Sequence, residues 1–506
     1  MPHFSHFARA TPDRPAYIMA GSGQVVTYGE LDRRSHQIAH FFRQQGLQPG
    51  DHIALMMKNC AEFLQVAQGA LRSGVVYTPI STHLREDETA YIIQNCQAKL
   101  FIVSADLIDV AADAAATASL DRIWVVGGGA SGFVDWNTAI AGLPETPIDD
   151  ECTGAPMLYS SGTTGQPKGV FQKPASTDIN QAHALEMSVG AFFGFNTETI
   201  YLSPAPLYHA APLHYNTLVL ATGGTSIIME KFDPEHALEL IQTYRATHSQ
   251  WVPIMFVRML KLDEEIRTRY DLSSMRMAIH AAAPCPIDVK QAMIDWWGPV
   301  IFEYYAASEG IGFTLIDSEQ WLTHRGSVGR PLFGDPRIVD ESGAVLPPGE
   351  IGQVYFADSS PFEYFGEPEK TREAFDQRGW GTTGDMGYLD EEGYLYLTDR
   401  KNFMIISGGV NIYPAEIENL MITHPLVADV AVFGIPNEEF GEQVHAVVQP
   451  HDWVDAHEAT AEALKTWLRE RLSHIKVPRS IEFIESLPRM DNGKLYKRHL
   501  MARYQA

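Results

Sequence analysis

The segment of residues 159–169, Tyr-Ser-Ser-Gly-Thr-Thr-Gly-Gln-Pro-Lys-Gly, concentrates groups that bind anions. Glycines let a backbone bend with positive φ and approach a ligand closely, and consecutive N–H groups in such a bend form a concave anion site. Hydroxyls add hydrogen-bond donors, and a lysine adds positive charge. The residues that supply these groups are Ser160, Ser161, Gly162, Thr163, Thr164, Gly165 and Lys168. They favour a polyphosphate ligand over a solvated linker, because linkers seldom follow a buried strand directly.

The spacing differs from that of the common P-loop, in which Gly-Lys is followed at once by Ser or Thr and a helix. Here Lys168 follows Gln-Pro, and no helix pattern starts directly after it. The segment instead resembles the phosphate loop of the adenylate-forming superfamily, which includes acyl- and aryl-CoA synthetases, luciferases and the adenylation domains of peptide synthetases. The resemblance implies that Thr163, Thr164 and Lys168 hold the β- and γ-phosphates of ATP, with Thr163 also near Mg²⁺.

Two further motifs of that superfamily follow in order. Residues 207–209, Leu-Tyr-His, resemble the aromatic-His element beside the substrate carboxylate, which implies a catalytic role for His209. Residues 281–284, Ala-Ala-Ala-Pro, are similar to the Gly-Gly-Ala-Pro turn under the adenine, which implies nucleotide contacts for Ala282 and Ala283. Both glycines of that turn are alanine here, so we expect a tighter pocket floor. A packing turn of small residues is the alternative interpretation.

Residues 304–309, Tyr-Tyr-Ala-Ala-Ser-Glu, resemble the superfamily's Gly-Tyr-Gly-x-Thr-Glu. The resemblance implies that Tyr305 stacks on adenine, that Ser308 reaches phosphate, and that Glu309 binds Mg²⁺, a hard cation that prefers oxygen ligands. Tyr304 replaces a glycine that lines the acyl tunnel in related ligases. Its phenol is therefore expected to narrow or redirect that tunnel. The alternative is an aromatic strand end in the core.

Residues 383–385, Thr-Gly-Asp, resemble the element that holds the ribose hydroxyls. An ionised Asp385 offers two acceptor oxygens, and the resemblance implies that Arg400 meets the same ribose. Asp399-Arg400 resembles the start of the superfamily's hinge segment. The hinge pivot then falls on Asn402, which is neutral where the family usually carries charge.

Residues 407–418 are very similar to the same segment of CoA ligases, which implies that Gly408 and Gly409 line the tunnel for pantetheine. A helix is expected to begin at Pro414, because a proline in the first helical turn loses no hydrogen bond. Lys494, in an Asp-Asn-Gly-Lys turn, resembles the catalytic lysine that bridges carboxylate and α-phosphate. The alternative for Lys494 is an ordinary surface lysine.

Together these motifs span residues 159–494 and imply an ATP-dependent acid:CoA ligase. The carboxylate attacks the α-phosphorus of ATP and Mg²⁺-pyrophosphate leaves; the C-terminal domain then turns about the hinge, and the CoA thiol attacks the acyl-adenylate. The implied cofactors are ATP, Mg²⁺ and CoA. A stand-alone adenylation enzyme that loads a carrier protein is the main alternative; a luciferase-like oxygenase and a catalytically idle nucleotide-binding protein are the others. Amino-acid activation is disfavoured, since no acidic residue is placed by motif to hold an α-amine.

The acid itself is expected to meet a mostly apolar and aromatic pocket. The candidate lining residues, chosen by their position in the motifs, are Tyr208, Ala210, Trp251, His280, Tyr304 and Phe313. Such a lining suits a medium- or long-chain fatty acid, an aryl acid, or a bulky alicyclic acid such as a steroid side chain, whereas acetate is not expected. His280 follows an apolar run and is equally compatible with a core histidine.

Strands alternate with helices along the chain, which predicts an α/β fold with parallel or mixed sheets. Thr27 and Glu30 have the spacing of a capping box at the start of a helix that carries Leu31, Ser35, Ile38 and Phe42 on one face. Apolar runs predict strands near 53–57, 75–79, 100–103, 123–126, 200–202, 226–229, 430–433 and 444–448, and helices near 61–73, 213–220, 236–244 and 464–472. Glycine and proline punctuation predicts a small β subdomain from about residue 337.

A domain boundary near Asp399 is expected to separate a large AMP-binding domain, residues 1–398, from a small, mobile α+β C-terminal domain, residues 399–506, that carries the catalytic lysine. The formal net charge of −25 argues against a nucleic-acid partner. Four scattered cysteines, the absence of a signal peptide pattern and the absence of a long apolar run predict a cytoplasmic protein without an integral membrane segment. The oligomeric state, for which a homodimer is one option, is left open.

Overall fold

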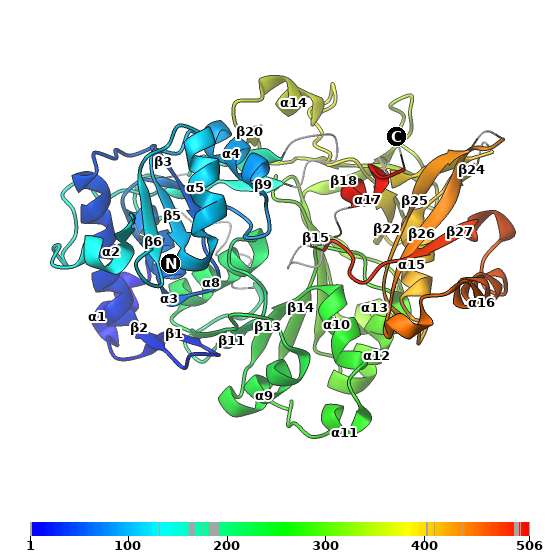
Figure 1. Cartoon of the computed structure of the whole chain (residues 1–506), viewed down its shortest axis with the longest axis horizontal. Helices are drawn as coiled ribbons and strands as arrows, with labels where there is room; N and C mark the ends of the chain where they lie inside the picture. The colour runs from blue at the N-terminus through cyan, green and yellow to red at the C-terminus, as the bar shows by residue number, and fades with distance from the viewer. Residues whose placement is uncertain are drawn as a thin grey trace. The chain divides into compact units, whose positions relative to one another are not determined.

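The computed structural model describes residues 3–130, 132–160, 167–174, 176–181, 192–400, 403–408, 410–437, 439–489, 495 and 497–504, without the side chains of residues 400, 498 and 499. It divides into two compact units (Figure 1). Unit one comprises Met1–Gln250, Leu262–Ala278 and Pro361–Glu373, and unit two comprises Trp251–Lys261, Ile279–Ser360 and Ala374–Ala506.

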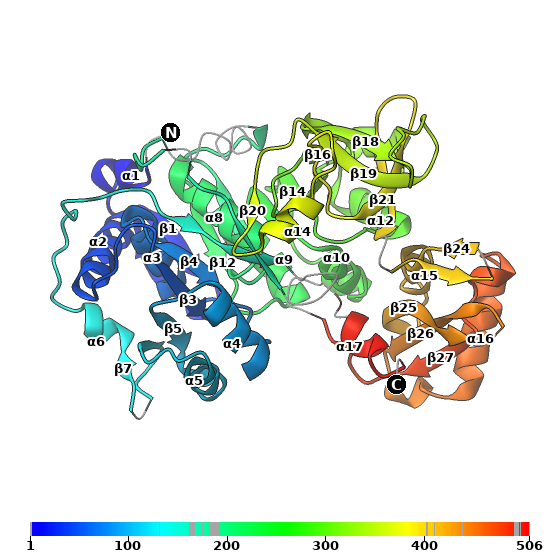
Figure 2. The same ribbon diagram turned by 90° about the horizontal axis from the view of Figure 1, so that it is seen from above.

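The first sheet of unit one is parallel and six-stranded, with the order β7-β6-β5-β3-β4-β8. Its strands are β3 (His52–Met56), β4 (Val76–Pro79), β5 (Phe101–Ser104), β6 (Ile123–Val126), β7 (Val134–Asp135) and β8 (Ala155–Pro156). The helices are α2 (Tyr28–Gln44), α3 (Ala61–Arg72), α4 (Glu86–Asn95), α5 (Ile108–Thr117) and α6 (Trp136–Ile140). Figure 2 shows α2 and α3 on one face of the sheet and α4 and α5 on the other. Because helices cover both faces, β3 and β5 are buried along their whole length.

The second sheet of unit one has the order β13-β11-β12-β1-β2, and it is parallel except for the β1–β2 pair. Its strands are β1 (Pro15–Met19), β2 (Val25–Thr27), β11 (Ile200–Ser203), β12 (Thr225–Ile228) and β13 (His248–Trp251). Helices α1 (Ser5–Ala10), α8 (Ala210–Thr222), α9 (Pro234–Tyr244) and α11 (Glu264–Arg267) also belong to this unit. A small antiparallel sheet of β9 (Leu158–Ser160), β10 (Lys168–Phe171) and β20 (Glu363–Tyr364), with helix α14 (Pro368–Glu373), completes it.

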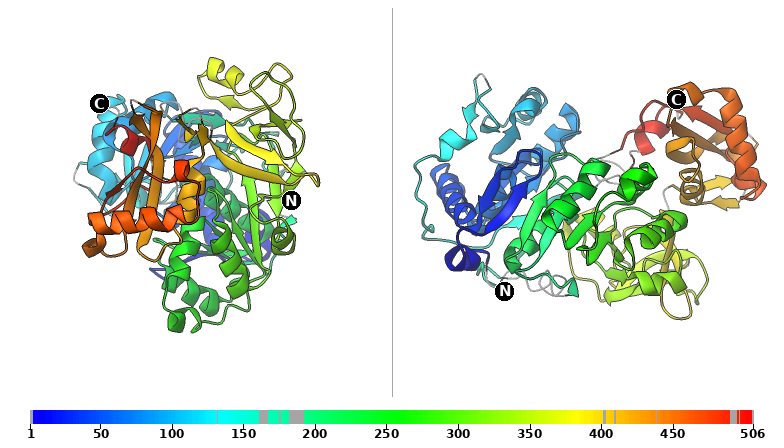
Figure 3. Two further views of the ribbon diagram at one scale, coloured as in Figure 1. Left: turned by 90° about the vertical axis from the view of Figure 1, so that its right-hand side faces the viewer. Right: turned by 90° about the horizontal axis from the view of Figure 1, so that it is seen from below.

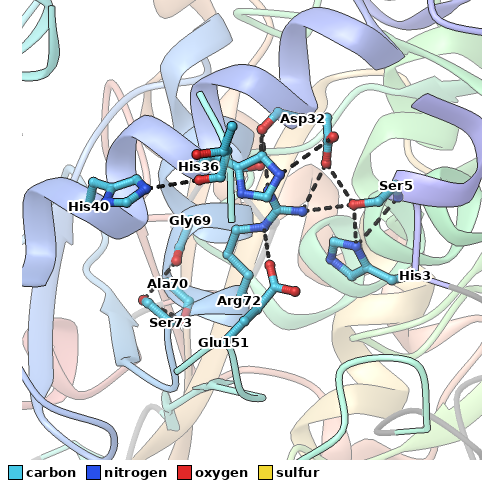
Figure 4. A network of polar contacts seen from close by, with 12 residues as sticks. His3, Ser5, Asp32, His36, His40, Gly69, Ala70, Arg72, Ser73 and Glu151 are labelled. Atoms are coloured by element: carbon cyan, nitrogen blue, oxygen red, sulfur yellow. Dashed lines mark hydrogen bonds and ion pairs between the residues drawn. The ribbon is translucent and has the colours of Figure 1, made fainter. Parts of the chain in front are cut away.

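A buried guanidinium joins distant segments of unit one (Figure 4). The side chain of Arg72, at the end of α3, donates to Ser5 Oγ at 2.7 Å and to Asp32 Oδ1 at 2.9 Å, and it lies 3.4 Å from Glu151 Oε1. The Ser5 hydroxyl in turn donates to Asp32 Oδ1 at 2.6 Å. Burial acts to raise the pKa of Asp32, but hydrogen bonding to His36 and the charge of Arg72 outweigh it and lower the pKa well below its usual value. The short helix α1 is thereby fixed to α2 and α3.

Unit two contains a sheet of order β17-β16-β15-β14, built from β14 (Met277–His280), β15 (Ile301–Ala306), β16 (Phe313–Ile316) and β17 (Arg330–Phe333). Its helices are α10 (Pro253–Leu260), α12 (Ile287–Trp297) and α13 (Ser318–Thr323). The expected small β subdomain is a four-stranded antiparallel sheet of β18 (Asp335–Val339), β19 (Gly352–Ala357), β21 (Asp385–Leu389) and β22 (Leu395–Arg400).

The C-terminal part of unit two is an α+β arrangement, drawn in orange and red in Figure 3. Its five-stranded sheet contains β23 (Ile405–Ser407), β24 (Val410–Ile412), β25 (Val427–Asn437), β26 (Gly441–Pro450) and β27 (Ser480–Phe483). Its helices are α15 (Pro414–Met421), α16 (Glu458–Arg469) and α17 (Lys497–Met501). The predicted fold class is confirmed. Within the described ranges, no helix is both long and apolar enough to cross a bilayer.

Several predicted boundaries need correction. Helix α8 begins at Ala210, three residues before the expected position, because His209 takes the extended N-cap conformation. Helix α16 ends at Arg469, so Leu472 lies beyond it and is half-buried. Strand β26 buries both faces in its middle, His445 and Val447 as well as the expected alternate residues, because β25 and β27 flank it and helices cover the sheet.

Candidate functional site

Strands β9 and β10 bring together the two ends of the predicted phosphate loop. Ser160 is the register partner of Lys168 in this antiparallel pair, and β10 confirms that no helix follows the lysine. Gly169 is required here, since an added Cβ would lie 3.0 Å from the ring of Tyr159. The loop residues predicted to bind phosphate, Ser161, Gly162, Thr163, Thr164 and Gly165, lie outside the described residues.

Tyr364, which no sequence motif indicated, lies beside the lysine of this loop. Lys168 Nζ is 4.4 Å from the centroid of the Tyr364 ring, which comes from β20 on the far side of β10. A lysine over an aromatic face is attracted by the ring quadrupole. The ring therefore favours one orientation of the ammonium group at the edge of the loop.

The aromatic-His element lies at the start of α8 in unit one. His209 is the N-cap residue, Tyr208 is buried in the core of unit one, and Ala210 packs against the same cluster. The Tyr208 and His209 rings are 4.4 Å apart. The sequence analysis missed Asn59, whose side chain fixes the preceding turn: Leu207 N–H donates to Asn59 Oδ1 at 2.7 Å, and Asn59 Nδ2 donates to Ala205 O at 3.2 Å. A polar residue just after buried β3 was the available signal, because such strand ends form ligand crevices.

The adenine turn contains a strained residue in unit two. Ala282 has φ of +77°, a conformation that costs an alanine about 1–2 kcal/mol and costs glycine little. It is exposed, whereas Ala281 is buried and Ala283 is half-buried. The departure from glycine noted in the sequence therefore carries a backbone cost at Ala282. Strain of this kind concentrates where backbone geometry serves a ligand.

Replacing Ala282 by glycine is expected to increase the free energy of unfolding by about 1 kcal/mol, because glycine adopts positive φ without the clash of Cβ. Ala283→Gly is the matched control; Ala283 has no positive φ, so that change should decrease the same free energy by about 0.5–1 kcal/mol. Denaturant titration measures both. An equal decrease for the two variants would show that Ala282 carries no relievable strain.

The predicted adenine and ribose residues are in direct contact within unit two. Tyr305 O–H donates to Asp385 Oδ2 at 2.6 Å across 80 residues of sequence, and Thr383 Oγ1 donates to the same oxygen at 2.7 Å. The carboxylate of Asp385 is buried. The β21–β22 register places Arg400 directly opposite Asp385. These three predicted nucleotide residues are thus brought together by one strand pair and the end of β15.

Phe356 supports the Tyr305 ring, and no motif identified it. The two rings stack with centroids 6.1 Å apart. Gly312 makes room for this phenylalanine, because an added Cβ would lie 2.1 Å from Phe356 Cδ1. Next along the predicted metal element, Ser308 is exposed and Glu309 is buried. A carboxylate beside a hydroxyl is the oxygen chemistry that Mg²⁺ prefers, so the residue types present fit that ion.

The candidate acyl-pocket residues of unit two fall into two groups. Tyr304 stacks on Phe313 with centroids 4.9 Å apart and planes 5° apart, and Phe313 stacks on Phe333 at 5.4 Å. Trp251 and His280 are fully buried. Trp251 packs edge-on against Trp297 at 5.6 Å, which is a core environment.

A buried ion pair that the sequence analysis missed lies beside His280. Lys290 Nζ is 2.6 Å from Glu303 Oε2, and His280 Nε2 is 3.6 Å from the same oxygen. Burial raises the pKa of Glu303, and the charge of Lys290 opposes that rise. Burial, with the charge of Lys290, lowers the pKa of His280 well below its usual value, so the imidazole is neutral at pH 7. Burial likewise raises the pKa of Cys285, which agrees with a packing role.

The pantetheine segment is a tight hairpin of β23 and β24. Gly408 has φ of +57°, and its N–H donates to Phe440 O at 2.8 Å. Helix α15 begins at Pro414 as predicted, and Asp399 Oδ2 accepts from Ala415 N–H at 2.9 Å in its first turn. Gly409, the hinge residue Asn402 and the catalytic candidate Lys494 lie outside the described residues.

Parallel sheets flanked by helices, an antiparallel subdomain, and nucleotide motifs in this order define the class of adenylate-forming enzymes. The chain belongs to the AMP-binding enzyme family, whose model matches residues 4–363, and the model of the AMP-binding enzyme C-terminal domain matches residues 416–494. The enzyme class predicted from the sequence, an ATP-dependent acyl-CoA synthetase, is confirmed by this match together with the ligases that the chain resembles.

Three similar proteins illustrate the range of these relatives. The chain is 33% identical to the long-chain-fatty-acid–CoA ligase FadD13 of Mycobacterium tuberculosis, over 99% of this chain and 97% of that protein. It is 30% identical to the fatty acid–[acyl-carrier-protein] ligase ScoC of Streptomyces coeruleorubidus, over 99% and 95%. The solved o-succinylbenzoate CoA synthetase MenE of Bacillus subtilis, in complex with its acyl-adenylate intermediate, matches with a TM-score of 0.82 and 26% identity, over 99% and 98%.

Proposed function

We propose that the enzyme activates a medium- or long-chain fatty, aryl or alicyclic carboxylic acid with ATP and transfers the acyl group to CoA. The observation that carries the nucleotide half is the hydrogen bond between Tyr305 and Asp385, with Arg400 opposite the aspartate. It joins the residues proposed to hold adenine and ribose. Bare backbone at Gly408 supports a path for the pantetheine arm of CoA.

The proposed residue roles divide the work of the adenylation step. His209 orients the carboxylate, Lys494 bridges it to the α-phosphate of ATP, and Lys168 with the hydroxyls of the phosphate loop holds the outgoing pyrophosphate. Glu309 and Thr163 would hold Mg²⁺, which neutralises phosphate charge when bound. Phosphoryl chemistry of this kind depends mainly on positioning and charge stabilisation. The proposed boundary between residues 1–398 and 399–506, with a pivot at Asn402, lies between the two matched family regions.

The stacked rings of Tyr304, Phe313 and Phe333 bear on the choice of acid. Aromatic faces pack well against flat or bulky apolar groups, which supports an aryl or alicyclic acid. A straight alkyl chain needs an open channel past residue 304. A fatty acid remains within the proposal, because it is the substrate class named for FadD13.

A carrier-protein loader is the second candidate, and the similarity to ScoC favours it. Both thiol acceptors present the same pantetheine arm, so the glycine hairpin fits either. Free CoA and a purified holo-carrier protein, offered separately in a thioester assay, distinguish the two functions. The balance of acidic residues and the four free cysteines support a cytoplasmic setting, and sedimentation would decide whether the enzyme is a homodimer.

The experiment that tests the proposal is pyrophosphate release with ATP and Mg²⁺ across fatty, aryl and steroidal acids, with and without CoA. Release that requires an acid, with acyl-CoA as product, is the expected result. Release with no acyl-CoA formed would favour the carrier-protein loader. The absence of release with every acid would contradict the proposed activity for those acid classes.

A further inference from the structure

Two buried ion pairs flank the turn that contains Lys494. Arg489 donates to both carboxylate oxygens of Asp429, at 2.6 Å for Oδ1, and Lys497 Nζ lies 2.7 Å from Glu418 Oε1. Arg489 and Lys497 stand on either side of the turn in sequence, and Arg489 forms an antiparallel bridge with Leu495. The described ends of the turn are thus held close together, each by a charged side chain. We call Arg489–Asp429 and Lys497–Glu418 the anchor pairs.

Both anchor carboxylates are fixed to the same strand, β25. Asp429 belongs to it and accepts from Val430 N–H at 2.8 Å, while Glu418 of α15 accepts from Val432 N–H at 2.6 Å. Burial acts to lower the pKa of Arg489, but hydrogen bonding to Asp429 and its charge outweigh it and raise the pKa, so the pair is charged at any working pH. β25 therefore serves as a common reference for both ends of the turn.

The burial of the anchor pairs argues for precise placement. Asp429 and Lys497 are each more than nine-tenths buried, and charges so placed cost free energy unless they are paired in good geometry. Apolar contacts already hold the same legs, since Leu487 and Leu495 pack against the Ala431–Phe433 face of the sheet. Four charged groups, two of them almost fully buried, are more than is needed to keep the chain attached.

We infer that the anchor pairs are positioning residues for Lys494, and this inference rests on the proposed adenylation function. They set the distance and direction from β25 at which the lysine is presented to the carboxylate and α-phosphate. A misplacement of about 1 Å can cost a reaction a factor of about 100. The anchor pairs should matter for acyl-adenylate formation, which uses Lys494, and not for thioester formation, which uses the glycine hairpin.

The test compares Asp429→Asn and Glu418→Gln with Glu462→Gln in both half-reactions. Glu462 forms a similar ion pair with Lys465, at 2.8 Å on α16, that does not touch the turn. Acid-dependent ATP–pyrophosphate exchange reports the first half-reaction, and conversion of supplied acyl-adenylate and CoA to acyl-CoA reports the second. We expect the anchor variants to slow exchange by about tenfold to a hundredfold while the second half-reaction changes less than about twofold. Glu462→Gln should change neither.

A cycle with Lys494→Ala separates positioning from general stability. If the anchor pairs act through Lys494, Asp429→Asn should cause no further loss of exchange once the lysine is absent. The retained second half-reaction shows that each variant is folded, and Glu418→Gln replaces Asp429→Asn if the latter is not. Equal loss in both half-reactions, or a further loss on top of Lys494→Ala, would overturn the inference. Exchange by wild type and by Glu462→Gln establishes the proposed function independently; its absence from both would overturn that function instead.

Discussion

Lys494→Ala is expected to slow acyl-adenylate formation by about 100- to 1,000-fold and to leave thioester formation from supplied acyl-adenylate almost unchanged. The attack of a carboxylate on the α-phosphate joins two negative groups, and a lysine between them stabilises the charge that develops. Once the adenylate exists, thiol attack on its carbonyl no longer needs that cation. ATP–pyrophosphate exchange and acyl-CoA formation from synthetic adenylate measure the two steps.

Lys465→Ala is the matched control for this variant. Lys465 belongs to the same C-terminal part of the chain, and its ammonium group pairs with Glu462 on the surface of α16. Its replacement should alter neither step, because surface ion pairs contribute little. If Lys494→Ala reduced both half-reactions to the same degree, the division of labour proposed for this lysine would be wrong. If it reduced neither, Lys494 would be the surface lysine that its position near the end of the chain also allows.

The second large effect is expected at the buried pair of Lys290 and Glu303. Glu303→Gln removes the negative charge and leaves a fully buried ammonium group without its partner, 2.6 Å away in the native protein. Removing one member of a buried pair typically costs about 3–5 kcal/mol. We expect a loss of this size in the free energy of unfolding, measured by denaturant titration.

The double variant Lys290→Met with Glu303→Leu is the informative comparison. Apolar residues of similar volume often replace a buried pair at little cost, because the desolvation of both charges is removed together. The double variant should therefore be clearly more stable than Glu303→Gln alone. Equal destabilisation would show that packing around Trp321, whose ring lies 4.9 Å from Lys290 Nζ, matters more than the charges.

The sequence predicted most elements that are buried by apolar side chains, and it failed where polar groups replace them. Strand β13 reads His-Ser-Gln-Trp, of which the sequence analysis recognised only the tryptophan. The strand is buried because its polar atoms find partners: His248 bonds to Thr247 Oγ1 at 2.8 Å and to Phe193 O at 3.1 Å. Such long-range partners leave no periodic signal, so a strand of this kind is not recognisable by its pattern.

The site shows the same limit. The motifs named Tyr305, Asp385 and Arg400, but their contact arises from strand register, which a sequence alone does not give. Tyr364 and Phe356 escaped because each acts by placing a ring against a motif residue from a distant strand. Such supporting contacts are specified by three-dimensional packing. Their residue types are common in any core, and no spacing distinguishes them.

The network around Arg72 has a consequence for how the start of the chain behaves in solvent. A helix of six residues near a terminus would ordinarily fray, and its amide hydrogens would exchange within seconds. Ser5 bonds to both Asp32 and Arg72, so opening α1 also strips partners from a buried guanidinium. The amides of Phe7–Ala10 should therefore exchange on the timescale of α2 and α3, as part of one cooperative unit that opens together.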